Sequence, residues 1–289
     1  KLAMRTTIFT SERDGYVKNL SDATGPKLND RDRQGGRLQF LFTPSDRTSM
    51  RVIMDYAELD EMCCAALTKK NNLAHVHTGT VVPGTDTIIS HPTLGFGLPI
   101  TLEKDFNKQE VYLTHPPRSQ AEDSGISLEI NRDYENFTLT SITGIRNFET
   151  EDFGDVDFGA ASVITDLNKL DVSSFTQEFR MAGDFDTPSG RDGHYVVGFY
   201  YHNQDVDNDS TLTAGVHTSP LLNNDATLKA GIAAVNDIYN GMQAGLIAQG
   251  MTAAQATAAN PYSLAADTFP AGAYARDIMK QDHKSYAFF

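Results

Sequence analysis

The sequence predicts an all-β chain, an antiparallel segment of a transmembrane β-barrel with about eight strands. Apolar and polar residues alternate in several segments, as in residues 36–43, where Leu38, Phe40 and Phe42 share one face. The connections between these segments alternate strictly between short and long. Strands that run between one rim of short turns and one rim of long loops give this order in outer-membrane barrels.

The eight predicted strands follow from this alternation and from the turn residues that bound it. They lie near residues 2–10, 36–43, 49–57, 125–132, 137–148, 174–182, 194–205 and 285–289. The short connections are residues 44–48, 133–136 and 184–193, and the long ones are residues 15–33, 58–123, 149–172 and 206–284. Loops this long are uncommon in compact soluble domains, so we expect short periplasmic turns and long extracellular loops.

One long connection, residues 206–284, is expected to carry helix. Within residues 226–259 alanine is frequent, and apolar residues recur at helical spacing from Leu228 onward. A glycine, Gly241 or Gly250, is expected to break this helix. The segment lacks the basic face of an interfacial membrane helix, so it is predicted to lie within the loop.

The apolar faces of the strands are expected to touch lipid. They are formed by Leu38, Phe40, Phe42, Ile126, Leu128, Ile130, Tyr195, Val197 and Phe199. Because the chain has no tryptophan, Tyr56, Tyr195 and Tyr201 are the candidates for an aromatic girdle at the lipid boundary.

Composition excludes some functions. With 38 acidic and 24 basic residues the net charge is −14, which argues against a nucleic-acid partner. No apolar run reaches the roughly 18 residues of a transmembrane helix. The sequence contains no nucleophile elbow and no zinc-protease motif, so we do not expect an enzyme.

Three segments resemble strands of TonB-dependent outer-membrane receptors. Residues 175–181 read Phe-Thr-Gln-Glu-Phe-Arg-Met and resemble the SQE-L-R-L strand of that family. Residues 197–201, Val-Gly-Phe-Tyr-Tyr, resemble its GLYY strand, and residues 139–146 resemble its LTSITAYR strand. The order of these motifs and the pattern of connections carry the resemblance, which covers about residues 2–205 and the last few residues.

The resemblance implies a receptor of about 22 strands around a plug domain. It would import a scarce ligand, of the siderophore, cobalamin or glycan class, across the cell outer membrane of a Gram-negative bacterium. Residues 1–289 would all belong to the barrel domain, with the plug outside this chain. The implied partners are outer-membrane lipid and lipopolysaccharide, the TonB energy-coupling complex reached through the plug, and the small-molecule or glycan ligand.

Two other functions remain open at this point. One is a passive porin-like channel, which would conduct without energisation. The other is a structural or interaction protein whose long loops bind a surface protein partner. A secreted β-sandwich would instead need polar residues on the face predicted to touch lipid.

Charged residues opposite the apolar face are the candidate site. In the strand at 174–182, Glu178 and Arg180 oppose Phe179 and Met181, and should therefore point into the barrel lumen. The residues with this pattern are Arg37, Arg51, Asp55, Glu129, Arg146, Glu178 and Arg180. We expect an ion-pair network along the inner wall, with direct ligand contact as the alternative.

Two further features concern cysteines and metal ions. Cys63 and Cys64 are adjacent, and either a vicinal disulfide or pairing with cysteines outside this segment is open. The aspartates Asp205, Asp207 and Asp209 resemble the start of a calcium loop, but the glycine and distal glutamate of an EF-hand are missing. We expect a solvated acidic loop, with calcium held by extracellular loops as the alternative, and no other cofactor.

Overall fold

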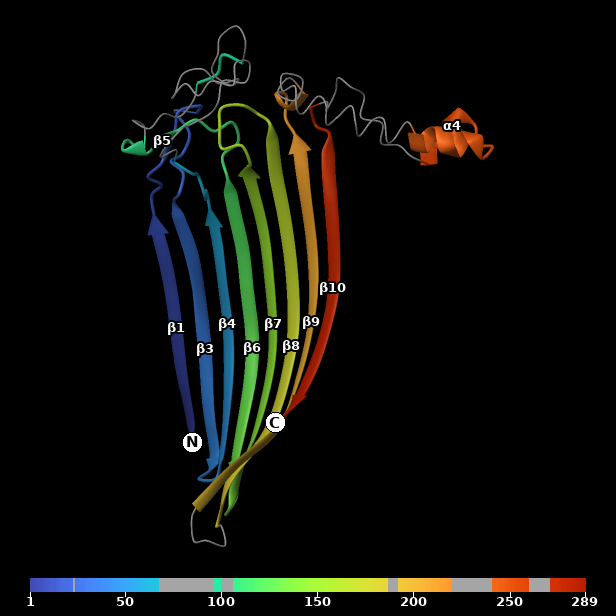
Figure 1. The fold of residues 1–289 in the computed structure, drawn as a ribbon. Helices are drawn as coiled ribbons and strands as arrows, with labels where there is room; N and C mark the ends of the chain where they lie inside the picture. Colours follow the sequence, from blue (N-terminus) through green and yellow to red (C-terminus); the bar gives the residue numbers. More distant parts are fainter. Residues whose placement is uncertain (23, 68–95, 100–105, 187–191, 220–240, 260–270) are drawn as a thin grey trace.

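The computed structural model describes residues 1–22, 24–67, 96–99, 106–186, 192–219, 241–259 and 271–289. Eight long strands form one antiparallel sheet in the order β1-β3-β4-β6-β7-β8-β9-β10 (Figure 1). Their bounds are β1 (Leu2–Arg13), β3 (Arg31–Ser45), β4 (Thr48–Glu61), β6 (Arg118–Asp133), β7 (Phe137–Asp155), β8 (Ile164–Asp186), β9 (Asp192–Ala214) and β10 (Tyr274–Phe288). Each long strand pairs with the next one along the chain, which confirms the predicted all-β, antiparallel fold class.

The strands are longer than the alternation predicted. β8 and β9 have 23 residues each, whereas about 9–11 residues suffice to cross a bilayer. The prediction of a last strand at 285–289 was wrong, because β10 already begins at Tyr274. The predicted loops at 149–172 and 206–284 were correspondingly too long, since β7, β8, β9 and β10 extend into them.

Short and long connections lie at opposite ends of the sheet (Figure 1). Asp46 and Arg47 join β3 to β4, and residues 134–136 join β6 to β7, at the lower end of the figure. A small parallel pair, β2 (Lys18–Asn19) and β5 (Glu110–Val111), lies at the upper end. We call these two ends the turn end and the loop end.

The last connection contains helix, as predicted. Residues 241–248 are helical, and α4 (Ala253–Ala259) follows after Gly250, whose φ is 98°. A capping box begins α4, since the Thr252 amide donates to Gln255 Oε1 (2.9 Å) and the Gln255 amide to Thr252 Oγ1 (3.3 Å). Residues 226–240 of the predicted helix lie outside the described residues. In the described part of the chain, every helix is too short or too polar to cross a membrane.

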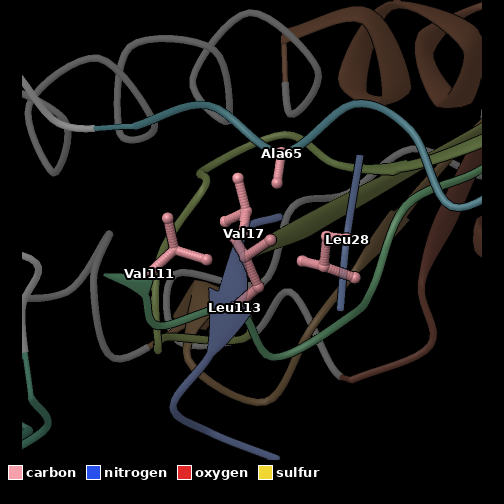
Figure 2. Close-up of a cluster of buried hydrophobic side chains, with 5 residues drawn as sticks. All are labelled: Val17, Leu28, Ala65, Val111 and Leu113. Atoms are coloured by element: carbon pink, nitrogen blue, oxygen red, sulfur yellow. The ribbon is translucent and has the colours of Figure 1, made fainter. Parts of the chain in front are cut away.

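The buried apolar core of the described residues lies at the loop end (Figure 2). It consists of Val17, Leu28, Ala65, Val111 and Leu113. The side chain of Asn19 fixes one side of this core, because its amide donates to the Leu113 carbonyl and its oxygen accepts from the Leu113 amide, both at 3.0 Å. Large apolar side chains of the sheet, in contrast, stay exposed, as for Phe179 at 54%. The sheet therefore has an apolar surface without a protein core against it.

Candidate functional site

Strand register divides the sheet into two chemically different faces. Successive residues of a strand point to opposite faces, and directly paired residues of neighbouring strands share one. The pairing therefore puts the predicted lipid-facing residues on one surface, which we call the apolar face. Its members include Leu38, Phe40, Phe42, Met50, Val52, Met54, Ile126, Leu128, Ile130, Leu139, Ile145, Phe175, Phe179, Val197 and Phe199. We call the opposite surface the polar face.

The apolar part of this face has the height of a hydrocarbon layer. Residues that pair across successive strands form a row. On β7 the apolar part runs from Phe137 to Asn147. The row of Phe137 contains Gly183 and Tyr195, and the row of Asn147 contains Tyr56. These rows are about 10 residues apart, or ~33 Å along the strand at ~3.3 Å per residue. At the ~40° tilt of barrel strands this corresponds to about 25 Å, which matches the apolar band of membrane barrels.

All seven candidate charged residues lie on the polar face, and ion pairs join them into three groups. The first group centres on Arg146, whose Nη1 lies 3.2 Å from Asp55 Oδ2 and whose Nη2 lies 2.5 Å from Asp123 Oδ2. Arg37 reaches the same Asp55 at 4.0 Å. Asp55 and Asp123 are therefore held together by one guanidinium that bridges β4, β6 and β7.

The second group lies nearer the turn end. Arg51 Nη2 lies 2.5 Å from Glu129 Oε2, and Asn131 donates to Glu129 Oε1 at 2.7 Å. The third group is a pair within β8, where Arg180 Nη1 lies 3.2 Å from Glu178 Oε1. Opposite charges thus meet both between neighbouring strands and along one strand. The assignment of this face to a barrel lumen remains a prediction.

Asp123 was not among the residues predicted from the sequence, although the pattern contained it. It continues the alternation of Gly125, Ser127 and Glu129 toward the loop end, beyond the point where the predicted strand began. Its Oδ2 binds Arg146, while its buried Oδ1 accepts no hydrogen bond from the described residues. That oxygen, like Glu178 Oε1, is a place on the polar face where a ligand or water donor would be accommodated.

Toward the loop end, beyond the apolar band, the apolar face becomes a charged belt. It holds Glu58, Glu122, Glu149, Glu151, Lys169, Asp171, Asp207, Asp209, Arg276 and Lys280, which line a groove of about 720 Å³. Lys169 pairs with Glu151 at 2.7 Å and Lys280 with Asp207 at 2.6 Å. Charged side chains on both faces indicate that this half of the sheet lies outside any hydrocarbon layer.

The predicted acidic loop at Asp205, Asp207 and Asp209 is strand instead. All three lie on β9, and Arg276 and Lys280 of β10 pair with Asp209 and Asp207. The run is therefore part of a paired strand, and calcium held by extracellular loops stays an alternative. Among the described residues, no group of three or more His, Cys, Asp or Glu side chains is arranged to hold a metal ion.

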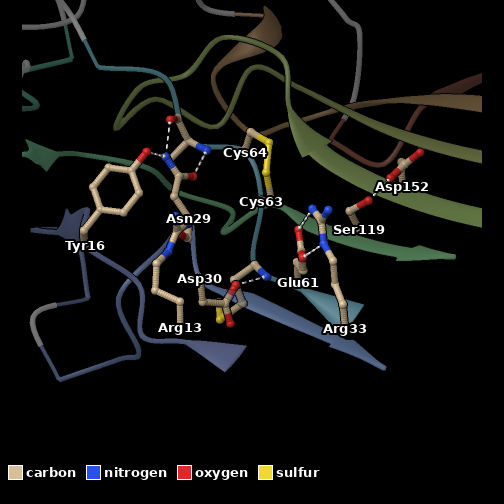
Figure 3. The surroundings of a disulfide bond; sticks show 12 residues. Arg13, Tyr16, Asn29, Asp30, Arg33, Glu61, Cys63, Cys64, Ser119 and Asp152 are labelled. Atoms are coloured by element: carbon tan, nitrogen blue, oxygen red, sulfur yellow. Dashed lines mark hydrogen bonds and ion pairs between the residues drawn. A yellow bond between two sulfur atoms is a disulfide. The ribbon is translucent and has the colours of Figure 1, made fainter. Parts of the chain in front are cut away.

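Cys63 and Cys64 form a disulfide with each other directly after β4 (Figure 3). The segment is fixed by two side chains that lie directly before β3. Asn29 accepts from the Ala65 amide (2.7 Å) and donates to the Ala65 carbonyl (3.1 Å), and Asp30 accepts from the Met62 amide (2.6 Å). The disulfide lines a pocket of about 310 Å³ at the loop end, together with Leu113, Phe153 and Phe158 among others.

Comparison with known proteins supports the architecture. No protein-family model matches the sequence, and no curated protein sequence matches it. Among solved structures, the chain is similar to the ferric yersiniabactin uptake receptor FyuA from Yersinia pestis, with a TM-score of 0.52 and 14% sequence identity over 74% of this chain. The fold is that of a β-barrel wall. The chain spans 28% of the length of that receptor, so the likeness concerns one part of a larger barrel.

The clamp by Asn29 gives a first prediction. Asn29→Ala removes both hydrogen bonds to Ala65 and places alanine at a φ of 60°, which asparagine tolerates better. We expect the segment to lose about 2 kcal/mol of local stability, at ~1 kcal/mol per hydrogen bond. Hydrogen exchange of the Ala65 amide should then be ~30-fold faster. Asn29→Gly also removes the hydrogen bonds but tolerates the positive φ. Exchange in Asn29→Gly as slow as in the wild type would contradict the role of the Asn29 side chain.

Asp155 gives a second prediction, on pH. It lies at the loop end of β7 and is 3% exposed; burial, with the neighbouring charge of Asp157, raises the pKa of Asp155 to about 6. The folded state then binds this proton more tightly than the unfolded chain, whose carboxyl titrates near ~4. The free energy of unfolding should therefore fall by ~2–3 kcal/mol as pH rises from about 4 to about 6, and change little above.

The pH effect is measured as the unfolding midpoint between pH 4 and pH 7. Asp155→Asn should flatten this profile, whereas Asp171→Asn, an exposed aspartate of β8, should leave it unchanged. An identical pH profile in Asp155→Asn and wild type would show that Asp155 does not control it.

Proposed function

We propose that this chain forms part of the barrel wall of a receptor that imports a scarce ligand across the cell outer membrane of a Gram-negative bacterium. The observation that carries the proposal is the division of one sheet into two faces. One face has an apolar band about 25 Å tall, and the other carries the ion pairs around Arg146 and Arg51. Such a sheet fits between hydrocarbon and a polar interior.

Strand length and connections support a receptor of the large, plugged kind. Strands of 23 residues extend well beyond a bilayer. They extend toward the loop end, where the long connections begin. In this proposal the loops and the polar wall select the ligand, which belongs to the siderophore, cobalamin or glycan class. Energy comes from the TonB complex through a plug outside this segment, and lipopolysaccharide surrounds the charged belt.

Uptake by intact cells tests this function. Cells with and without the gene are given three probes: a ⁵⁵Fe-labelled siderophore mixture, ⁵⁷Co-cobalamin and a radiolabelled oligosaccharide mixture. Each uptake is repeated with a protonophore. We expect one probe to accumulate only in cells that carry the gene, and only without the protonophore. Gene-dependent uptake that persists with the protonophore would favour the passive channel, and no gene-dependent uptake would contradict the ligand classes.

A further inference from the structure

The apolar face is hollowed near the turn end. A groove of about 520 Å³ crosses β6 to β9, and its side chains on this face include Ile130, Leu139, Phe179, Met181 and Val197. These side chains occupy two adjacent rows of the sheet, at the lower part of the apolar band. The groove is therefore apolar, continuous with the band, and open on the side where the sheet has no protein core.

One charged side chain ends this groove. Arg132 lies on the apolar face, in the row of Thr48 and Leu139, next to the last row of the apolar band at the turn end. Its Nη1 donates to Thr48 Oγ1 at 3.2 Å, and its Cζ lies 5.7 Å from the ring centroid of Tyr134. No carboxylate of the described residues forms an ion pair with it. Its positive charge is thus exposed and available to an anion.

The surroundings of Arg132 are those of a lipid headgroup level. Tyr134 and Phe137 stack with ring centroids 4.7 Å apart in the turn below it. Tyrosine and phenylalanine rings of this kind collect at the boundary between hydrocarbon and water in membrane proteins. A guanidinium at the same level binds phosphate oxygens with two parallel hydrogen bonds.

We propose that this groove binds one membrane phospholipid, with an acyl chain along Ile130, Leu139 and Phe179 and its phosphate on Arg132. The inference rests on the proposed membrane location and adds a specific lipid site to it. The ligand needs both an apolar tail and an anionic group, because the groove offers an apolar surface beside the positive charge of Arg132. Ten residues line the groove, fewer than the 20–30 per side of a stable protein interface, so a single lipid fits it better than a protein partner.

Native mass spectrometry of the intact protein in bilayer nanodiscs that contain phosphatidylglycerol tests the site. Arg132→Gln should retain about tenfold less lipid, the effect of losing one charge-assisted hydrogen bond. Val197→Phe, which fills the groove, should also lower retention. Arg132→Lys keeps the charge but loses the planar fork, and should retain an amount of lipid between those of Arg132→Gln and the wild type. Arg47→Gln, in the neighbouring turn, is the matched control and should retain lipid as wild type does, and glycerol 3-phosphate, which has no acyl chain, should not be retained.

The site is overturned if Arg132→Gln retains as much phosphatidylglycerol as the wild type, or if Arg47→Gln loses as much as Arg132→Gln. Circular dichroism confirms that each variant is folded, and Arg132→Lys provides the comparison if the glutamine variant is not. A protein that resides in the outer membrane and imports its ligand, yet retains no lipid, would refute this site and leave the proposed function standing. A protein absent from the membrane fraction would refute both.

Discussion

Phe40→Arg should destabilise the protein in a lipid bilayer by about 2–4 kcal/mol. Phe40 shares its row with Val52 and Leu128, midway between the rows of Phe137 and Asn147 that bound the apolar band. An arginine at the middle of the hydrocarbon layer of a barrel costs this amount, whereas the cost falls to about 0–1 kcal/mol near the interfaces. The free energy of unfolding of the protein reconstituted in bilayers, followed in a denaturant titration, gives the effect.

The matched control uses the same strand and the same face. Gln34 lies in the charged belt, where it binds Glu58 of β4. Gln34→Arg puts the same charge beside a carboxylate and outside the band, and should change stability by less than about 1 kcal/mol. Equal losses from both substitutions would contradict a lipid-facing band on this face.

Arg146→Met should lower the free energy of unfolding by about 2–3 kcal/mol. The substitution leaves Asp55 and Asp123 without the guanidinium that bridges them, and the two carboxylates then repel each other on a partly buried surface. Loss of one partner of a fully buried pair costs about 3–5 kcal/mol, and we lower this range because the Arg146 side chain is 48% exposed.

A double variant separates the charge effect from lost packing. Arg146→Met combined with Asp123→Asn removes one of the two orphaned carboxylates, and should recover about half of the loss. Arg146→Lys should recover little, because a lysine ammonium does not bridge two carboxylates with a planar fork. A double variant that is less stable than Arg146→Met would contradict the bridging role.

Sequence alternation predicted the parts of the sheet in which the two faces differ chemically. From Leu38 to Phe42, and from Ile126 to Ile130, the residues predicted to touch lipid alternate with the others, and the structure puts each set on one face. The same alternation predicted the polar-face residues, because the residues between the apolar ones point to the opposite face of the sheet. Asp123 was not predicted as a polar-face residue only because the predicted strand began two residues after it.

The loop half of the strands could not be predicted in this way. On β9 beyond Asn203 the side that continues the apolar face carries Asp205, Asp207 and Asp209, and on β10 before Ser285 charged residues occur on both faces, so no apolar stripe identifies either strand there. The belt pairs, such as Asp209 with Arg276, depend on register between distant segments. The clamps of Asn19 and Asn29 likewise join residues 94 and 36 positions apart, and local sequence carries no sign of them.

The central claim is that one sheet separates lipid from a polar interior, and a nitroxide scan along β6 tests it most directly. Single cysteines are placed from Glu122 to Arg132 in a background with Cys63→Ser and Cys64→Ser, labelled, and studied in bilayers by electron paramagnetic resonance. We expect collisions with oxygen to dominate at positions 126, 128 and 130. Collisions with a water-soluble nickel chelate should dominate at positions 127 and 129, and at position 122, in the charged belt. A scan without this period of two, or with the opposite phase, would contradict the account.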